Sequence, residues 1–397
     1  MVKLYLKQNH VASFLQDDKS YLLEYKDFDI KNSITLSLPN TKKFYLYEHR
    51  FPPYFETFLP EGYLYEIFKN LLTKEFGYID EYLIFSKLSP NILSRVEFKS
   101  EFEKLDFDFL NVENILQNDS EDTFKHLVDT FLNKNAISGV QPKSVAILLD
   151  KQRLHTKEYI VKTWGVEFSH LAENEYFCLK ACQKAGIEIP NIQLSYNKKF
   201  LLVENFIFKN SKTLGFEEVL SLMDKNTNNK YSGSYEQVAK TIYRFCTNKK
   251  SALKELFKMV VMSYLLKNGD AHLKNFALLF DDDFTNIYLS PCYDVVNTTS
   301  YIFKDRPALT LHGKKMWYAK DGLVEFGIKS CLLSKKEAKD VYEICIEALK
   351  SSIEDIKIYI EDNSEFKKIG SRMIASFTQS LKDESIKELG DELTRAW

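Results

Sequence analysis

One stretch of the sequence has residue types and a spacing that could transfer a phosphoryl group: Lys267-Asn268-Gly269-Asp270-Ala271-His272-Leu273-Lys274-Asn275-Phe276. Asp270 and Asn275 have the Asp-x-x-x-x-Asn spacing of phosphotransferase catalytic loops. In such loops the Asp orients an acceptor hydroxyl, and the Asn reaches a Mg²⁺ ion. The pattern alone is common, and Asn275 could equally cap a turn. The surrounding elements therefore have to decide between these interpretations.

A predicted hairpin follows this stretch. Phe276–Phe280 and Ile287–Leu289 are apolar, strand-like runs on either side of an acidic turn at 281–286. Because a hairpin brings its ends together, Asp294, just beyond the second run, is expected to lie beside Asn275. Two oxygen-bearing side chains there would suit a nucleotide-bound Mg²⁺, since this cation prefers oxygen ligands.

Charged residues upstream could orient phosphates. Lys162 lies near the end of the strand-like run Tyr159–Thr163, and Glu173 and Glu175 open the predicted helix Glu173–Ala185. Lys162 could contact a nucleotide, or it could be an ordinary edge lysine whose stem covers apolar surface. Either glutamate could pair with Lys162 or simply interact with the helix dipole.

Two other segments have weaker patterns. Ser138-Gly139-Val140-Gln141-Pro142-Lys143 could form a tight loop whose backbone N–H groups cover phosphates, although a surface turn has the same composition. Glu204-Asn205-Phe206 lies within the strand-like run Phe200–Phe208. In a two-lobed kinase this position is the hinge that offers backbone groups to adenine.

Several other classes of protein are excluded. None of the 13 glycines forms Gly-x-Gly, and the P-loop, His-Glu-x-x-His and Gly-x-Ser-x-Gly patterns are absent. The six cysteines form no Cys-x-x-Cys, so buried thiols are expected. A formal net charge of −2 gives no basic excess for nucleic-acid binding. The apolar runs, of roughly eight residues at most, are too short to span a membrane, and the N-terminus has no signal-peptide pattern. We expect a cytoplasmic protein that does not contact a membrane.

The order of predicted elements gives the fold class. The 397 residues suggest two to three domains at about 150 residues each. Strand-like runs come first, with one helix after them, and the chain becomes mainly helical beyond residue 215. This order predicts an α+β fold with two lobes rather than alternating βαβ units. The further predicted elements are strands at Val2–Leu6, Val11–Leu15, Tyr21–Tyr25 and Ser144–Asp150, helices at Tyr63–Phe76, Leu253–Lys267 and from Ser334 to about Lys350, and a boundary or surface excursion at 97–122.

Taken together, these segments resemble the HipA family of serine/threonine-protein kinase toxins. Asn268–Phe276 is similar to the family's Asn-x-Asp-x-His-x-Lys-Asn catalytic loop, and Tyr293-Asp294-Val295 looks like its metal-binding Tyr-Asp-Val. Phe55–Gly62 resembles a marker of its N-terminal subdomain. The resemblance implies a two-lobed, protein-kinase-like fold. It has a β-rich N-terminal subdomain at 1–103, a kinase N-lobe at 104–207 and a mainly α-helical C-lobe at 208–397.

The resemblance also implies a role for each matching residue. Asp270 would be the catalytic base, and Asn275 and Asp294 would hold Mg²⁺. Lys162 would contact the phosphates of ATP. The other implied ATP-binding residues are Ser138, Gly139, Val140, Gln141, Pro142, Lys143, Glu204, Asn205, Phe206, His272, Leu273, Lys274 and Tyr293, together with Asn275 and Asp294.

The sequence departs from the family pattern at two places. The family hinge often reads Glu-Arg-Phe-Asp-Arg, whereas here it reads Glu204-Asn205-Phe206-Ile207-Phe208, so side-chain contacts of the missing Arg and Asp cannot be carried over. The family's best-known autophosphorylated serine falls on Ala136, which has no hydroxyl. Ser138 matches a second serine used in some members and is therefore the predicted autophosphorylation site.

The resemblance implies an ATP- and Mg²⁺-dependent serine/threonine-protein kinase that acts as the toxin of a type II toxin–antitoxin system. Its protein substrate would be an aminoacyl-tRNA synthetase, glutamyl-tRNA synthetase being the family's best-known case. Its partner would be a small helix-turn-helix antitoxin of the HipB type, through which alone it would reach DNA. Two alternatives remain: a small-molecule phosphotransferase, and a nucleotide-binding regulatory module with little catalysis.

Overall fold

The fold is taken from a computed structural model that describes residues 1–102, 112–120, 122–123, 152–155, 159–163, 168–209 and 212–382. The chain divides into two compact units. The first comprises Met1–Glu167, Ser195–Asn229 and Leu279–Asn286, and the second comprises Phe168–Leu194, Lys230–Leu278 and Ile287–Trp397. The predicted strand Ser144–Asp150 lies outside the described residues.

The first unit begins with a five-stranded antiparallel sheet, as the strand-like runs predict. Its order is β4-β3-β2-β1-β5. Glu97–Lys99 forms strand β5 at one edge, so interpreting the start of 97–122 as a boundary or surface excursion was wrong. Only one residue of this short strand, Phe98, points inward, which is too little to give a recognisable alternating pattern. The strands are β1 (Val2–Leu6), β2 (Asn9–Asp17), β3 (Ser20–Tyr25), β4 (Phe44–Glu48) and β5 (Glu97–Lys99).

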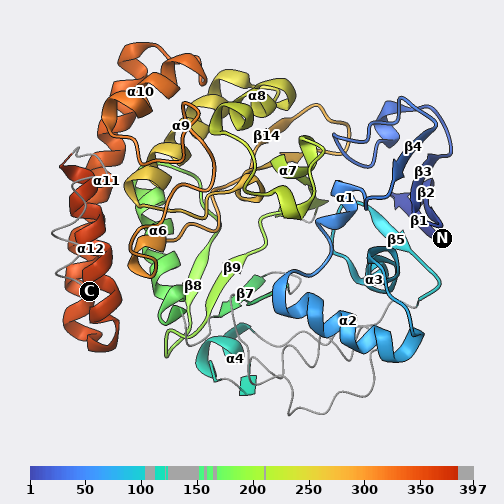
Figure 1. The fold of residues 1–397 in the computed structure, drawn as a ribbon, viewed down its shortest axis with the longest axis horizontal. Helices are drawn as coiled ribbons and strands as arrows, with labels where there is room; N and C mark the ends of the chain where they lie inside the picture. Colours follow the sequence, from blue (N-terminus) through green and yellow to red (C-terminus); the bar gives the residue numbers. More distant parts are fainter. Residues whose placement is uncertain are drawn as a thin grey trace. The chain divides into compact units, whose positions relative to one another are not determined.

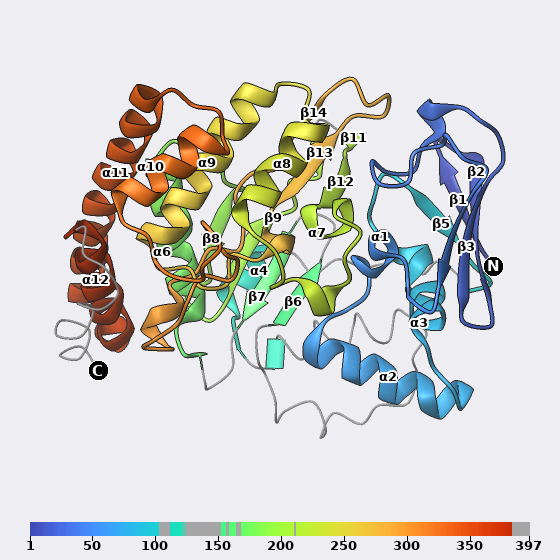
Figure 2. The same ribbon diagram turned by 45° about the horizontal axis from the view of Figure 1, so that its top comes forward.

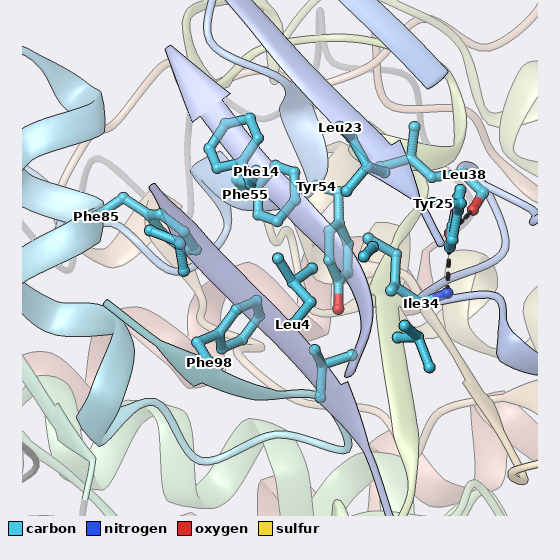
Figure 3. Close-up of a cluster of buried hydrophobic side chains, with 14 of the residues drawn as sticks. Leu4, Phe14, Leu23, Tyr25, Ile34, Leu38, Tyr54, Phe55, Phe85 and Phe98 are labelled. Carbon is cyan, nitrogen blue, oxygen red and sulfur yellow. Dashed lines mark hydrogen bonds between the residues drawn. The ribbon is translucent and has the colours of Figure 1, made fainter. Parts of the chain in front are cut away.

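Aromatic rings fill the core of this sheet. Short helices α1 (Pro53–Glu56) and α3 (Glu81–Leu88) supply rings that pack on the sheet. Phe14 stacks on Phe55 at 4.0 Å between ring centroids, and Phe85 contacts both rings edge-on (Figure 3). The Tyr25 hydroxyl donates to the Leu38 carbonyl and accepts the Ile34 N–H (Figure 3). This buried hydroxyl thereby holds two points of the loop that follows β3, at Ile34 and Leu38.

A second cluster of the first unit contains the predicted helix at 63–76, which is α2 (Gly62–Phe76). Gly77 ends it in a left-handed conformation that glycine adopts without strain. Phe68 and Leu72 pack with residues of α4 (Val112–Gln117), β7 (Tyr159–Thr163) and β9 (Leu201–Glu204). β7 lies between β6 (Gln152–His155) and β9 in an antiparallel arrangement. The predicted strand Phe200–Phe208 is shorter than expected, because β9 ends at Glu204 and the chain then turns.

A buried carboxylate connects two distant segments of the first unit. Glu217 lies on β12 (Gly215–Glu218), just before α7 (Val219–Leu222), with its side chain buried. It accepts hydrogen bonds from the hydroxyls of Thr35, Ser37 and Ser221. It also accepts the backbone N–H groups of Leu36 and Ser37, at 2.9 and 3.1 Å. The loop at 35–37 in the N-terminal part is thereby held against β12.

We expect Glu217→Ala to lower the free energy of unfolding by about 3 kcal/mol, because two partly buried N–H groups and three hydroxyls lose their acceptor. Glu217→Gln is expected to cost about 1 kcal/mol, since its amide oxygen can accept both N–H groups and the hydroxyls can rotate to accept its NH₂. Denaturant titrations of both variants measure this difference. Equal losses would contradict the account.

The same carboxylate makes stability depend on pH. Burial raises the pKa of Glu217 above its ordinary value of 4.5, against the opposing effect of its hydrogen bonds. The folded protein therefore retains this proton to a higher pH than the unfolded chain does. The Glu217 contribution to stability is full below the unfolded pKa and is lost as the pH rises through the folded pKa. Glu217→Gln should remove this part of the pH dependence.

The second unit is mainly helical. Its central helix, α11 (Lys335–Asp362), packs against α6 (Leu171–Lys184), α9 (Lys249–Leu265), α10 (Lys320–Lys329) and α12 (Lys367–Leu381) (Figures 1 and 2). Ser334 and Glu337 form a capping box at the start of α11. The predicted end near Lys350 was wrong, because Ile353 and Ile356 continue the buried face and the helix runs on to Asp362. The remaining elements include α8 (Tyr235–Phe245), β8 (Ile192–Leu194), β10 (Phe208–Lys209) and β11 (Lys212–Thr213), the last two being in the first unit.

All six cysteines are buried and unpaired, as expected from their spacing. Among the residues that the structure describes, no helix combines the length and the apolar character that crossing a membrane requires.

Candidate active site

Helix α9 brings the chain to the loop that contains Asp270. Its buried face includes Leu256, Val260 and Tyr264, which fix it within the second unit. The helix ends at Leu265, and Lys267 then adopts a left-handed backbone conformation, with φ of +53°. This turn directs the following residues away from the helix axis.

Hydrogen bonds between backbone groups and the side chains of Asn268 and Thr298 then hold the start of the loop. The Asn268 side chain accepts the Asp270 N–H at 3.1 Å. The Gly269 N–H donates to the Thr298 hydroxyl at 2.9 Å, and that hydroxyl donates to the Lys267 carbonyl at 3.1 Å. A Cβ atom on Gly269 would lie 2.0 Å from a carboxylate oxygen of Asp305, so a larger residue here would require the Asp305 side chain to move.

Asp270 and His272 lie close together after this turn. His272 Nε2 is 3.9 Å from Asp270 Oδ1, and the Tyr231 hydroxyl donates to the same oxygen at 2.8 Å. His272 also begins a single turn of 3₁₀ helix, η6 (Leu273–Asn275). The His272 ring nitrogen Nδ1 accepts the backbone N–H of Lys274. The backbone N–H of His272 donates to Asn275 Oδ1 at 2.9 Å. The spacing between Asp270 and Asn275 is thus fixed by a capped turn.

The predicted hairpin exists and brings Asp294 to Asn275. It consists of β13 (Ala277–Phe280) and β14 (Ile287–Leu289), and Ser290 N–H donates to the Ala277 carbonyl at its base. The Asn275 Nδ2 donates to Asp294 Oδ2 at 3.0 Å. Both side chains are buried. The expected proximity of these two residues is therefore confirmed.

Contacts on both sides of Asp294 fix its position. The Tyr293 hydroxyl donates to the Lys274 carbonyl at 2.7 Å, which ties the residue before Asp294 to the loop. Asp294 has a φ of +61°, a left-handed conformation that Asp and Asn adopt more readily than other side chains. Beyond it, Asn297 N–H donates to Asn174 Oδ1 at 2.7 Å, and Asn174 Nδ2 donates to the Asn297 carbonyl at 3.1 Å. The start of α6 thereby anchors the segment that carries Asp294.

The electrostatics near the loop include a buried lysine. Burial lowers the pKa of Lys267 to about 8, and its ammonium group lies 5.2 Å from the centroid of the Trp317 ring. An aromatic face partly compensates a cation that has lost water.

The residues at this place fit a Mg²⁺ ion carried by a nucleotide. Asp294 supplies a carboxylate and Asn275 an amide oxygen, and phosphotransferases hold Mg²⁺ through one or two such ligands plus phosphates and water. Asn275 Oδ1 accepts the His272 N–H, but a carbonyl oxygen has a second lone pair for a cation. These two residues would therefore hold the ion.

Other predicted site residues belong to the first unit. Lys162 is buried on the central strand β7, opposite Leu201 of β9. Glu204 ends β9 and is exposed, whereas Asn205 is buried, and its carbonyl accepts the Phe208 N–H in a tight turn. The Phe206 ring lies 6.0 Å from that of Phe216. The predicted phosphate loop, Ser138–Lys143, lies outside the described residues.

The predicted acidic helix start has partners within the second unit. Glu173 is bonded to the His170 ring and accepts the Tyr359 hydroxyl at 3.1 Å. Asn174, between the two predicted glutamates, has the clearer role, since it anchors the segment after Asp294. Local spacing did not indicate this role of Asn174, because its partner Asn297 is 123 residues away.

Sequence patterns did not predict a role for two other residues that contact the loop. Tyr231 lies 39 residues before its partner Asp270, and Thr298 lies 29 residues after its partner Gly269. Neither residue type is distinctive at its position, so the sequence offered no signal for either.

Comparisons with known proteins add family evidence. Residues 135–353 match the family model described as HipA-like C-terminal domain. A Haemophilus influenzae protein named "Putative kinase" is 29% identical over 184 residues, which is 42% of this chain and 53% of that protein. "Putative kinase Y4dM" of Sinorhizobium fredii is 26% identical over 195 residues, or 45% of this chain and 47% of that protein. The matches thus span about half the length of these curated relatives.

The fold also has a match among solved structures. HipA of Shewanella oneidensis, from a complex of the toxin–antitoxin system HipA and HipB with operator DNA, aligns with a TM-score of 0.72. The alignment covers 96% of this chain and 98% of that chain at 14% identity. The predicted α+β, kinase-like fold is therefore confirmed. Since the family model covers more than half of the residues, the chain belongs to the HipA family.

Proposed function

We propose that this protein is an ATP- and Mg²⁺-dependent serine/threonine-protein kinase. The observation that carries the proposal is one capped loop that presents Asp270 and, five residues later, Asn275, hydrogen-bonded to Asp294. These are the base and the metal-binding side chains of a phosphotransferase catalytic loop. Kinase-named relatives and membership of the HipA family support the same reading.

The chain's own residues would act mainly by positioning. Asp270 accepts the proton of the acceptor hydroxyl as that oxygen bonds to the γ-phosphorus and the bond to ADP breaks. The His272 ring, beside the same carboxylate, would lie along the nucleotide. Asn275 and Asp294 would hold the metal ion, which would neutralise charge on the phosphates.

The other proposed ATP-binding residues are taken from the family's sequence motifs. Lys162 would contact the phosphates, as would the loop Ser138–Lys143. The backbone at Glu204–Phe206 would hold adenine, without the Arg and Asp side chains of other family hinges. Autophosphorylation of Ser138 would add nearly two negative charges beside the ATP phosphates and so limit activity.

The biological setting follows from the family. We propose a cytoplasmic toxin of a type II toxin–antitoxin pair, whose substrate is an aminoacyl-tRNA synthetase. A small helix-turn-helix antitoxin similar to HipB would bind it and provide the contact with DNA. The similar HipA structure was solved with HipB and operator DNA, which supports this partner.

An acceptor screen tests the proposal. Purified protein is incubated with γ-labelled Mg-ATP and a bacterial lysate, with Asp270→Asn as the control, and labelled proteins are identified by mass spectrometry. Label on serine or threonine of a synthetase, absent with the variant, is the expected result. Transfer to aminoglycosides but to no protein would instead support the small-molecule phosphotransferase.

A separate peptide map tests the self-limiting step. Phosphate on Ser138 after incubation with Mg-ATP would support it. An active preparation with no phosphate at Ser138 would overturn the autophosphorylation proposal and leave the kinase proposal intact.

A further inference from the structure

Tyr231 makes a direct contact with the proposed catalytic base. It lies in the segment that leads into α8, and its hydroxyl donates to Asp270 Oδ1 at 2.8 Å. Its ring meets the His272 ring edge-on, with 5.1 Å between centroids. Tyr231 therefore touches two of the residues that would act in transfer.

The backbone around Tyr231 is held by three hydrogen bonds, one of which comes from the loop that contains Asp270. The Leu273 N–H, inside that loop, donates to the Lys230 carbonyl at 3.1 Å. The Lys315 ammonium donates to the Tyr231 carbonyl at 3.0 Å, and the Thr310 N–H donates to the Gly233 carbonyl at 3.1 Å. These bonds hold the backbone of this segment, and the bond from the hydroxyl ties the Tyr231 side chain to Asp270.

A hydrogen bond on one oxygen of a carboxylate restricts its rotation. A carboxylate can accept through both oxygens, so a donor fixed on Oδ1 orients Oδ2. Small misplacements of a catalytic group cost large factors in rate. Building on the proposed kinase function, we propose that Tyr231 is a positioning residue: its hydroxyl holds Asp270 Oδ1 so that Oδ2 receives the acceptor proton.

Tyr231→Phe tests this role, because it removes the hydroxyl and keeps the ring against His272. The rate of transfer from γ-labelled Mg-ATP to lysate proteins, at saturating Mg-ATP, is expected to fall about tenfold, the effect of losing one hydrogen bond to a charged group. The Mg-ATP concentration for half-maximal rate and the thermal midpoint should stay unchanged, because the hydroxyl acts on the base alone.

Tyr243→Phe is the matched control. Tyr243 lies on α8 and is 45% exposed, against 44% for Tyr231, and its ring lies under the Lys249 ammonium. The same chemical change there should leave the transfer rate unaltered.

The possible outcomes separate this proposal from the proposed function. An unchanged or faster rate in Tyr231→Phe would overturn the positioning role, a faster rate meaning that the hydroxyl competes with the acceptor. A slower rate with a lower thermal midpoint and weaker ATP binding would also overturn it, because the effect would then be structural. If the unaltered protein binds ATP but transfers no phosphate, the proposed kinase function fails and this role fails with it.

Discussion

Replacing Asp270 by Asn is expected to lower the rate of phosphate transfer from Mg-ATP by about 10²–10⁴-fold, the usual contribution of a general base. Asn has nearly the same shape and can still accept the Tyr231 hydroxyl, so the loop should keep its structure. Only the ability to take a proton is lost. Steady-state transfer rates and calorimetric ATP binding measure the two quantities separately.

A matched control distinguishes this effect from a general charge effect. Asp340 is an exposed aspartate on α11, and Asp340→Asn makes the same chemical change away from the loop. It should transfer phosphate at the original rate. If Asp270→Asn retained full activity, the assignment of Asp270 as base would be wrong.

Asp294→Asn is expected to reduce transfer by about 100-fold at a fixed Mg²⁺ concentration, because a neutral amide is a weaker ligand for a hard cation. Asn tolerates the left-handed backbone conformation at this position and can still accept the Asn275 amide. The fold should therefore survive. Transfer rates are measured at a series of Mg²⁺ concentrations. The concentration that gives the half-maximal rate should be higher for the variant than for the unaltered protein.

Asp283→Asn provides the comparison for this second variant. Asp283 lies in the exposed turn of the same hairpin, where it accepts the Thr285 hydroxyl at 2.8 Å. Its replacement should leave the Mg²⁺ dependence unaltered. If Asp294→Asn has the same Mg²⁺ dependence as the unaltered protein, the assignment of Asp294 as a metal ligand is wrong.

Local sequence patterns predicted the elements that position the site. The apolar face of α9 and the two apolar runs around the acidic turn are regular, and they place Asn275 beside Asp294. The five-residue spacing from Asp270 to Asn275 matches the capped turn that the structure contains. Each of these features depends on residues close together in the chain, where periodicity and turn composition are informative.

Contacts between distant segments could not be predicted in this way. Glu217 accepts both of its backbone N–H donors from a loop about 180 residues earlier, and Tyr231 contacts Asp270 across 39 residues. A single Glu or Tyr has no pattern that names its partner. The length of α11 was underestimated for a different reason, since Lys350 and Ser351 interrupt the apolar spacing before Ile353 resumes it.

The most direct test of the central claim measures ADP and phosphoprotein in the same reaction. The protein is incubated with γ-labelled Mg-ATP and lysate proteins, beside Asp270→Asn and Asp340→Asn. If Asp270 is the catalytic base, ADP is matched by protein-bound phosphate for the unaltered protein and for Asp340→Asn, and both products are lost in Asp270→Asn. If the unaltered protein binds ATP but forms neither ADP nor phosphoprotein, the kinase proposal is wrong and a regulatory nucleotide-binding module is favoured.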